Sequence, residues 1–181
     1  NKLVKITKPK DAIKNGIVYL SEERQNLGMT GLMSVKDNIN MAIMEKNSKY
    51  LIIDKLKDLK NASSLQDKLN IKVSYWSQLA QSLSGGNQQK TVIAKWLSTK
   101  PEIIILDEPT KGIDVRSKSA VHEFMGELVE SGMSIIMISS ELPEILGMCD
   151  RVVVMYKGLI KNILDVPKTS AEEIVKLASG E

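Results

Sequence analysis

The sequence predicts an α/β fold with parallel strands. Two apolar runs, at residues 103–106 and 135–138, have the length and β-branched composition of buried strands, and so has the stretch 17–20. Residues 114–132 begin with an aspartate suited to an N-cap, carry apolar residues at helical spacing and end at a glycine. A strand, a helix and a strand in this order predict a βαβ unit, in which two parallel strands are joined by a right-handed crossover.

The residues between the first two strands predict a loop and two helical regions. A loop with two glycines is expected at 26–31. Ser34 stands three residues before Asp37, which predicts a capping box at the start of a helix. The leucines and charged residues of 54–69 predict an amphipathic helix with a break near 61–63.

After the βαβ unit, the sequence predicts a β-hairpin and a last helix. Residues 152–156 and 159–164 are strand-like, and a Lys-Gly pair joins them. Thr169 and Glu172 have the spacing of a capping box. The helix that follows carries its apolar residues at Ile174, Val175 and Leu177.

Composition and charge exclude several classes of protein. The chain has 181 residues, of which 43% are hydrophobic, and a net charge of +3, which fits one globular domain and not a disordered segment. No apolar run approaches the roughly 18 to 20 residues of a membrane-spanning helix. The small positive charge, without an arginine-rich stripe, gives little support for a nucleic-acid partner.

The supply of cysteine and histidine excludes further kinds of site. Cys149 is the only cysteine of the sequence and cannot form an internal disulfide, which fits a reducing compartment. His122 is the only histidine, so zinc sites of the usual cysteine and histidine kinds are excluded. A Ser-His-Asp triad would depend on His122, whose neighbours are typical of a solvated helix face.

The first motif that carries chemistry is Leu-Ser-Gly-Gly-Asn-Gln-Gln-Lys at 83–90. Gly85 and Gly86 let a backbone approach a ligand closely, and Ser84 can cap the helix that follows. The N-terminus of a helix directs N–H groups and a positive dipole end outward, as phosphate-binding sites do. The residue types alone also fit an ordinary capped helix.

The second motif is the apolar run 103–106 followed by Asp107 and Glu108. Ligands of parallel α/β sheets bind at the carboxyl ends of the strands. Successive strand residues face opposite ways, so one carboxylate can lie near Mg²⁺ and the other near an attacking water. An acidic pair at this place also fits a simple turn, which Pro109 favours.

Together, these motifs resemble those of the ATP-binding cassette (ABC) superfamily. Residues 83–90 resemble its signature motif, residues 103–108 its Walker B strand with the following glutamate, and 111–114 its D-loop. The resemblance implies binding of ATP and Mg²⁺ and an ABC-type ATPase activity. It assigns the following site residues: catalytic Glu108, Asp107 and Ser140; nucleotide-binding Ser84, Gly85, Gly86, Gln88 and Asp114; metal-binding Asp107 and Glu22.

Two finer features narrow the resemblance. The form Ser-Gly-Gly-Asn-Gln-Gln-Lys at 84–90 and the segment 138–148 are similar to the second cassette of the tandem ATPases that energise monosaccharide importers of the ribose, galactose and xylose type. Segments 16–24 and 34–39 are similar to that cassette too. The resemblance covers nearly the whole chain, but it does not identify the sugar.

The sequence departs from the superfamily pattern at three places. It contains no Gly-x-x-x-x-Gly-Lys-Ser/Thr stretch, so we expect an incomplete P-loop NTPase-type ABC cassette that is inactive as an isolated chain. Ser140 stands at the position of the switch histidine, which puts hydrolysis in question. Glu22 stands at the position of the Q-loop glutamine, where a carboxylate could ligate Mg²⁺, although an exposed turn residue also fits.

The resemblance therefore implies a fold and a function. We expect a partial core strand with the Q-loop region at 1–33, a helical subdomain with the signature motif at 34–98, and the C-terminal part of the ATPase core at 99–181. The expected parent is the ATP-hydrolysing, energy-coupling component of a sugar-import ABC transporter, peripheral on the cytoplasmic face of the cell membrane. Its partners would be an opposing cassette, membrane permease subunits and, indirectly, a periplasmic or extracellular sugar-binding protein, with no nucleic acid.

Two alternatives stay open at this point. One is a soluble ABC-type ATPase that acts on nucleic acid or ribosomes. The other is a catalytically inert interaction module, which for the isolated chain is compatible with the transporter hypothesis for its parent. The residues encoded before Asn1 would separate them, because a P-loop preceded by a whole first cassette would indicate the tandem importer.

Overall fold

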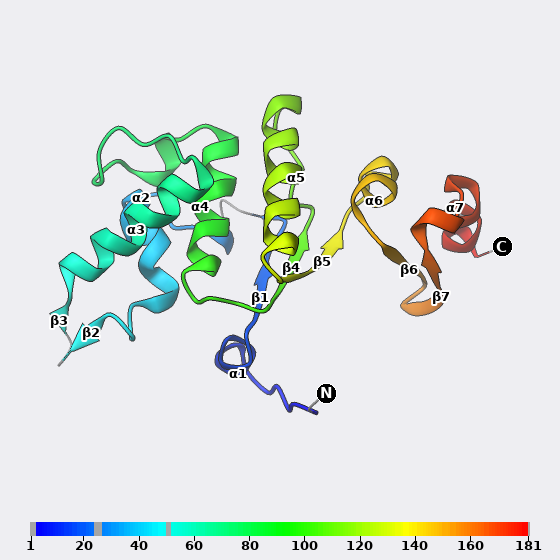
Figure 1. Cartoon of the computed structure of the whole chain (residues 1–181), viewed down its shortest axis with the longest axis horizontal. Coiled ribbons are helices and arrows are strands. Elements are labelled where there is room, and N and C mark those ends of the chain that lie inside the picture. Colours follow the sequence, from blue (N-terminus) through cyan, green and yellow to red (C-terminus); the bar gives the residue numbers. More distant parts are fainter. Residues whose placement is uncertain (1–2, 24–26, 50–51, 181) are drawn as a thin grey trace. The chain divides into compact units, whose positions relative to one another are not determined.

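The computed structural model describes residues 3–23, 27–49 and 52–180. Arg24 and Asn26, which belong to two of the expected segments, lie outside the described residues. The chain forms two compact units, Asn1–Ile138 and Ser139–Glu181, and each is described by itself (Figure 1). The expected three-part division of the chain stays a prediction.

The first unit contains a three-stranded parallel sheet. Its strands are β1 (Ile17–Leu20), β4 (Ile103–Asp107) and β5 (Ser134–Ile138), in the order β1-β4-β5. Both neighbouring pairs are parallel. Helix α5 (Val115–Glu130) connects β4 with β5, so the predicted βαβ unit with parallel strands is confirmed.

Helices α4 (Gly85–Leu97) and α5 bury one face of this sheet. The strand side chains Leu20, Ile104 and Leu106 are almost inaccessible and join a core cluster with the apolar residues of both helices. On the opposite face, Ile136 is 53% exposed and Ile138 is 48% exposed. The expectation of fully buried strands is therefore wrong for alternate residues, because successive side chains of a strand point to opposite faces.

The remaining elements of the first unit are mostly helical. They are α1 (Pro9–Lys14), α2 (Val35–Asn40), the 3₁₀ turn Met41–Ile43, β2 (Ser48–Lys49), β3 (Ile52–Ile53), α3 (Lys55–Leu69) and the 3₁₀ turn Ala80–Ser82. Helices α2, α3 and α4 pack against one another. The expected break in α3 is wrong, because Ala62 and Leu65 are buried in the core cluster and continue its apolar face.

The predicted capping-box-like start of α2 is confirmed in its N-cap bond, and Asp37 pairs with the Ser34 hydroxyl. The Ser34 side chain accepts a hydrogen bond from the Asp37 backbone N–H at 3.1 Å and donates its hydroxyl to Asp37 Oδ2 at 2.6 Å. The first of these bonds satisfies one of the backbone donors that every helix N-terminus leaves without an intrahelical partner.

Two buried polar side chains hold the loop between β1 and α2. Lys95, on α4, donates from Nζ to the Gly28 carbonyl and lies over the Trp96 ring. Burial lowers the pKa of Lys95, because the charged ammonium loses water. The Asn38 carboxamide accepts from the Thr30 N–H at 2.8 Å and donates to the Thr30 carbonyl at 3.0 Å. These contacts set the path of the chain from β1 to the helical part.

The second unit consists of a β-hairpin and helices. Its elements are α6 (Leu142–Met148), β6 (Arg151–Tyr156), β7 (Leu159–Asp165), the 3₁₀ turn Val166–Lys168 and α7 (Ala171–Ser179). Strands β6 and β7 are antiparallel, so the predicted hairpin is confirmed. Helix α7 packs on β6, with Ile174 and Val154 buried.

The predicted cap of α7 is displaced by one residue. Ser170, and not Thr169, is the N-cap, and its side chain accepts from the Glu173 N–H at 3.2 Å. The Thr169 hydroxyl instead donates to the Asp165 carbonyl at 2.8 Å. Val175, expected on the apolar face, is exposed. Among the residues that the structure describes, no helix is long and apolar enough to cross a membrane.

Candidate functional site

Acidic residues gather at the carboxyl edge of the parallel sheet, where β1 and β4 end side by side. Asp107 is the last residue of β4, and its Oδ2 accepts a hydrogen bond from the Tyr19 hydroxyl at 2.6 Å. Glu22 follows β1, and its Oε1 lies 2.6 Å from Lys111 Nζ. We call Glu22, Asp107 and Glu108, with Tyr19 and Lys111, the acidic edge.

The charges of the acidic edge influence one another. The pKa of Tyr19 is raised, first by its hydrogen bond to Asp107 and then by burial and the nearby carboxylate charges. The pKa of Lys111 is also raised, mainly by the hydrogen bond and charge of Glu22, with smaller contributions from Glu108 and Asp107. The Lys111 ammonium is thus kept charged among carboxylates, although the side chains of the ion pair are 60% and 44% exposed.

Glu108 lies outside the strand and has an unusual backbone. Its φ of 48° is in the left-handed region, which few residues other than glycine adopt. Its backbone N–H donates to the Ile138 carbonyl at 2.9 Å, which ties the end of β4 to the end of β5. The direction of the Glu108 side chain therefore follows from this turn. The prediction that Asp107 and Glu108 face opposite ways as successive strand residues is wrong, because β4 ends at Asp107. A turn is present, as Pro109 indicated.

We call residues 83–90 the signature loop; Leu83 and Ser84 precede α4, and residues 85–90 are the first residues of that helix. Ser84 occupies the N-cap position, but its side chain accepts no backbone hydrogen bond there. Its Oγ instead accepts from Asn87 Nδ2 at 3.0 Å. The predicted side-chain cap by Ser84 is wrong, because the Ser84 hydroxyl accepts from the Asn87 carboxamide and not from a backbone N–H of α4.

Gln88, which belongs to the signature loop, is buried in α4, and its side chain is not directed to solvent. Its Nε2 donates to the carbonyls of Leu83, at 3.1 Å, and Gln81, at 3.3 Å. Gln88 therefore fixes the backbone of the signature loop from inside. Its assignment to nucleotide binding stays a prediction, and the geometry supports an indirect role in it.

Asp114 caps α5. Its Oδ1 accepts from the Ser117 N–H at 3.0 Å, and its Oδ2 accepts from the Ser117 hydroxyl at 2.6 Å. These hydrogen bonds, the side-chain bond first, lower the pKa of Asp114. The predicted N-cap is confirmed, and both carboxylate oxygens of this candidate nucleotide-binding residue have partners within α5.

The turn after β5 belongs to the second unit. Ser140 is exposed there, and its predicted catalytic part stays a prediction. Its neighbour Ser139 donates to Glu144 Oε2 at 2.7 Å and accepts from the Glu141 N–H at 3.0 Å. Ser139 thus organises the start of α6.

Sequence reasoning missed two residues that hydrogen-bond to predicted ones: Tyr19, which bonds to Asp107, and Ser117, which bonds to Asp114. Ser117 carried a readable signal, since it stands three residues after an N-cap aspartate. Tyr19 carried a weaker one, as a polar-tipped residue in an apolar strand.

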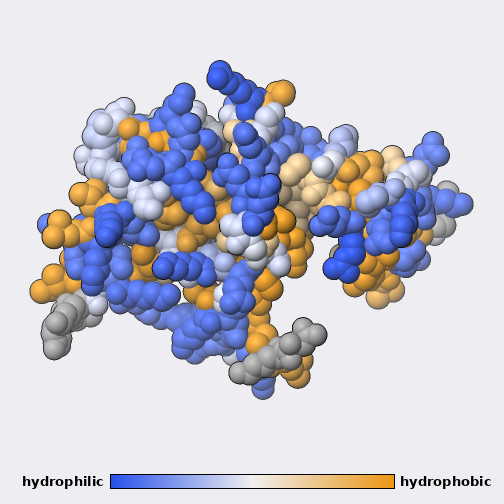
Figure 2. All heavy atoms as spheres, in the orientation of Figure 1, coloured by the Kyte–Doolittle hydropathy of each residue, from blue (hydrophilic) through white to orange (hydrophobic). Residues whose placement is uncertain are grey.

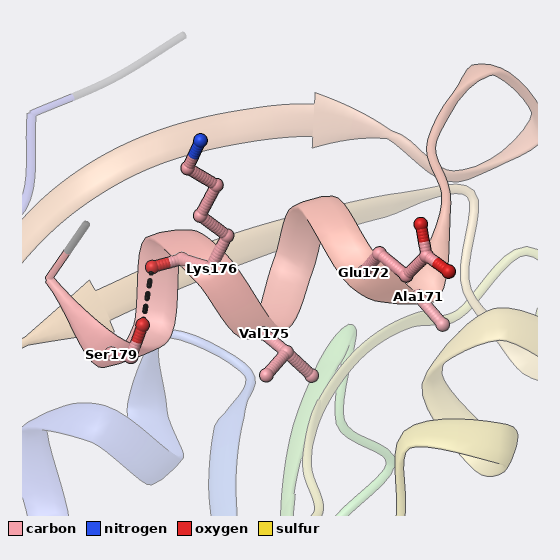
Figure 3. A pocket seen from close by; sticks show the side chains of 5 residues that line it. All are labelled: Ala171, Glu172, Val175, Lys176 and Ser179. Carbon is pink, nitrogen blue, oxygen red and sulfur yellow. Dashed lines mark hydrogen bonds between the residues drawn. The ribbon is translucent and has the colours of Figure 1, made fainter.

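Elsewhere in the described residues, the features that could form a metal or ligand site are weaker. No group of three or more His, Cys, Asp or Glu side chains there could hold a metal ion by itself. A hollow lies along α7, lined by Ala171, Glu172, Val175, Lys176 and Ser179 (Figure 3). One helix supplies all five residues, so the hollow does not surround a ligand, and it contains no predicted site residue.

The fold and the order of these motifs define an ATP-binding cassette. The chain aligns with the ATP-binding cassette MJ1267 of an ABC transporter with a TM-score of 0.73 and 23% identity, over 95% of this chain and 68% of that one. It aligns with a nucleotide-free ATP-binding cassette from an ABC transporter with a TM-score of 0.75 and 21% identity, over 97% and 69%.

Residues 3–111 match the ABC transporter family, and the chain belongs to that family. It is 46% identical over 179 residues to the xylose import ATP-binding protein XylG of Thermoanaerobacter pseudethanolicus, covering 99% of this chain and 35% of that protein. It is 45% identical to the ribose import ATP-binding protein RbsA of Clostridium perfringens, covering 98% and 36%. The chain thus spans about a third of the length of these relatives.

Proposed function

We propose that this chain is part of the ATP-hydrolysing, energy-coupling component of a sugar-import ABC transporter. The observation that carries the proposal is the 46% identity to a xylose import ATP-binding protein over 99% of the chain. The fold agrees with it, since the signature loop and the acidic edge lie in one compact unit. The soluble nucleic-acid alternative has no comparable support, because the relatives named above are import proteins.

The two parts of the site would serve different nucleotides. The signature loop, with Ser84, Gly85 and Gly86 at the N-terminus of α4, would face ATP held by an opposing cassette, because a helix N-terminus favours phosphate. The acidic edge would serve this cassette's own nucleotide, with Glu108 beside the attacking water.

The residues of the acidic edge fit Mg²⁺ in part. Mg²⁺ is commonly bound by one or two carboxylates together with phosphate oxygens of the substrate, and it supplies charge neutralisation when bound. Asp107, at the end of β4, is a suitable carboxylate. Glu22 would have to share its carboxylate between the cation and Lys111, since the ammonium lies 2.6 Å from Oε1.

We propose that the isolated chain binds ATP weakly or not at all, as a portion of a cassette without its P-loop. The sequence has no Gly-x-x-x-x-Gly-Lys-Ser/Thr stretch, and the helix N-terminus of the signature loop offers only one wall of a site. Calorimetric titration with Mg-ATP, corrected by titration with Mg²⁺ alone, tests this. A dissociation constant in the low micromolar range, about −8 kcal/mol, would contradict it.

The proposed partners are an opposing cassette, permease subunits and, through these, a sugar-binding protein outside the cell, with the chain peripheral on the cytoplasmic face of the membrane. The helical part exposes apolar surface on the face shown in Figure 2. By their exposed fractions, Leu32, Met33 and Met44 are exposed, whereas Met29 is buried in the core cluster. We propose that the exposed side chains contact the permease, since methionine adapts to irregular surfaces.

Crosslinking in membranes tests this contact. In a background without Cys149, Met33→Cys should crosslink to the permease, and Met29→Cys, at 7% exposure, is the matched buried control. Equal crosslinking from both positions, or none from position 33 in any nucleotide state, would contradict the proposal.

A further inference from the structure

The signature loop and the Asp114 turn meet at a close backbone contact. Helices α4 and α5 pack together, and Gly86 in the first turn of α4 lies against Ser117 in the first turn of α5. A Cβ added at Gly86 would lie 2.7 Å from Ser117 Oγ and 3.0 Å from Ser117 Cβ. A residue larger than glycine at position 86 would therefore require the Ser117 side chain or one of the helices to shift.

Ser117 is itself held in place. Its hydroxyl donates to Asp114 Oδ2 at 2.6 Å, and its N–H donates to Asp114 Oδ1 at 3.0 Å. Hydrogen bonds to a carboxylate are among the stronger ones in proteins, so the position of the Ser117 side chain follows that of Asp114.

On the other side of the contact, Gly86 belongs to a firmly packed loop. Gly86 is buried, and two residues later the Gln88 N–H donates to the Ser84 carbonyl at 2.9 Å. The buried Gln88 carboxamide also holds the Leu83 carbonyl. Because packed interiors transmit displacements, a shift at Gly86 would move the loop as a whole.

We propose that Ser117 is a positioning residue that couples the Asp114 turn to the signature loop. Its side chain, oriented by Asp114, is the surface on which Gly86 rests, so neither segment moves without the other. In a transporter this would link a turn of the chain's own cassette with the loop that faces the opposing nucleotide. That consequence rests on the proposed function, whereas the coupling itself does not.

Amide hydrogen exchange on the chain without nucleotide tests the coupling. The reporters are the amides of Gln88 and Lys118, which donate to the Ser84 and Asp114 carbonyls. Ser117→Ala should speed exchange at both by about fivefold, the effect of losing one hydrogen bond. Ser117→Thr, which keeps the hydroxyl, should stay near the wild-type rates. The control is Ser119→Ala, whose exposed hydroxyl bonds only within α5 to the Val115 carbonyl in the described contacts.

The reciprocal variant makes the test decisive. Gly86→Ala should speed exchange at Lys118, on the other helix, when it is made in the wild-type chain, but it should add little when it is made in Ser117→Gly, because that variant lacks the two atoms that the new Cβ would meet. If Gly86→Ala does not fold, recovery of the fold in the double variant, followed by circular dichroism, gives the same answer. The proposal is overturned if each variant alters only its own segment, or if Gly86→Ala speeds exchange at Lys118 as much in Ser117→Gly as in the wild-type chain.

Discussion

The signature loop and the acidic edge are held in different ways. In the signature loop, Gly86 and Gln88 are buried, and the loop is supported by the core between α4 and α5. At the acidic edge, the Tyr19–Asp107 hydrogen bond and the Glu22–Lys111 ion pair lie on exposed surface. The first segment is prearranged by the chain's own core, whereas the second depends on contacts that water and salt weaken.

Under the proposed function, this difference would decide which part of the site the chain completes alone. A loop that faces a nucleotide on another cassette has to keep its shape without that nucleotide, and burial provides this stability. An acidic edge that binds its own nucleotide and cation can be rearranged when they arrive. The predictions below test this contrast.

The largest expected effect is on transport. In the intact transporter, Ser84→Arg should abolish sugar uptake, because a bulky cation at the start of α4 prevents closure over the opposing nucleotide. Glu108→Gln should have a smaller effect, since Ser140 stands where the family has its switch histidine. Sugar uptake into membrane vesicles that contain each variant measures this. The control is Ser119→Arg, on the exposed surface of α5. A loss with Glu108→Gln as complete as with Ser84→Arg would refute the contrast.

The next largest effect is expected on the stability of the chain, from a substitution of a buried residue in the signature loop. Gln88→Leu removes the donor to the Leu83 and Gln81 carbonyls and should lower the free energy of unfolding by about 1 to 3 kcal/mol. Ser84→Ala should cost less than about 0.5 kcal/mol, although it changes an N-cap residue, because this serine makes no side-chain cap. Urea denaturation measures both, and equal losses would contradict the described roles.

A pH effect is expected at the Asp114 turn. The pKa of Asp114 is lower in the folded chain than in the unfolded one, so its contribution to stability is present above the unfolded pKa, about 4. It is lost as the pH falls through the folded pKa. The stability difference between wild type and Ser117→Ala should therefore be larger at pH 7 than at pH 3, as urea midpoints would show. A difference that grows in acid would contradict this sign.

The smallest effect is expected at the acidic edge. Lys111→Ala and Glu22→Gln should leave the thermal midpoint nearly unchanged, because the ion pair is exposed and each side chain can return to water. Differential scanning calorimetry at low and at physiological salt checks this. A clear drop in the midpoint with either variant would show that the acidic edge also supports the fold.

The sequence predicted the elements whose causes are local. The Asp114 cap, the Ser34 cap and the hairpin around Lys157 depend on a few neighbouring residues, and all three are present. The two wrong cap predictions, for Ser84 and Thr169, also have local causes, because another nearby group bonds to each hydroxyl. The Asn87 carboxamide donates to the Ser84 hydroxyl, and the Thr169 hydroxyl donates to the Asp165 carbonyl. Several acceptable partners within one turn cannot be ranked from sequence, since their energies differ by less than the effect of packing.

The sequence by itself determined the family, the order of the motifs and the parallel βαβ unit, because motif spacing and apolar periodicity are properties of the chain alone. The tertiary structure alone decided which residues meet. Tyr19 reaches Asp107 across 88 positions of sequence, and Gly86 lies against Ser117 on another helix. It also decided that Ile136 and Ile138 stay exposed on one face of the sheet. Such contacts depend on how helices pack on a sheet, and this packing is set by the whole core and not by any local pattern.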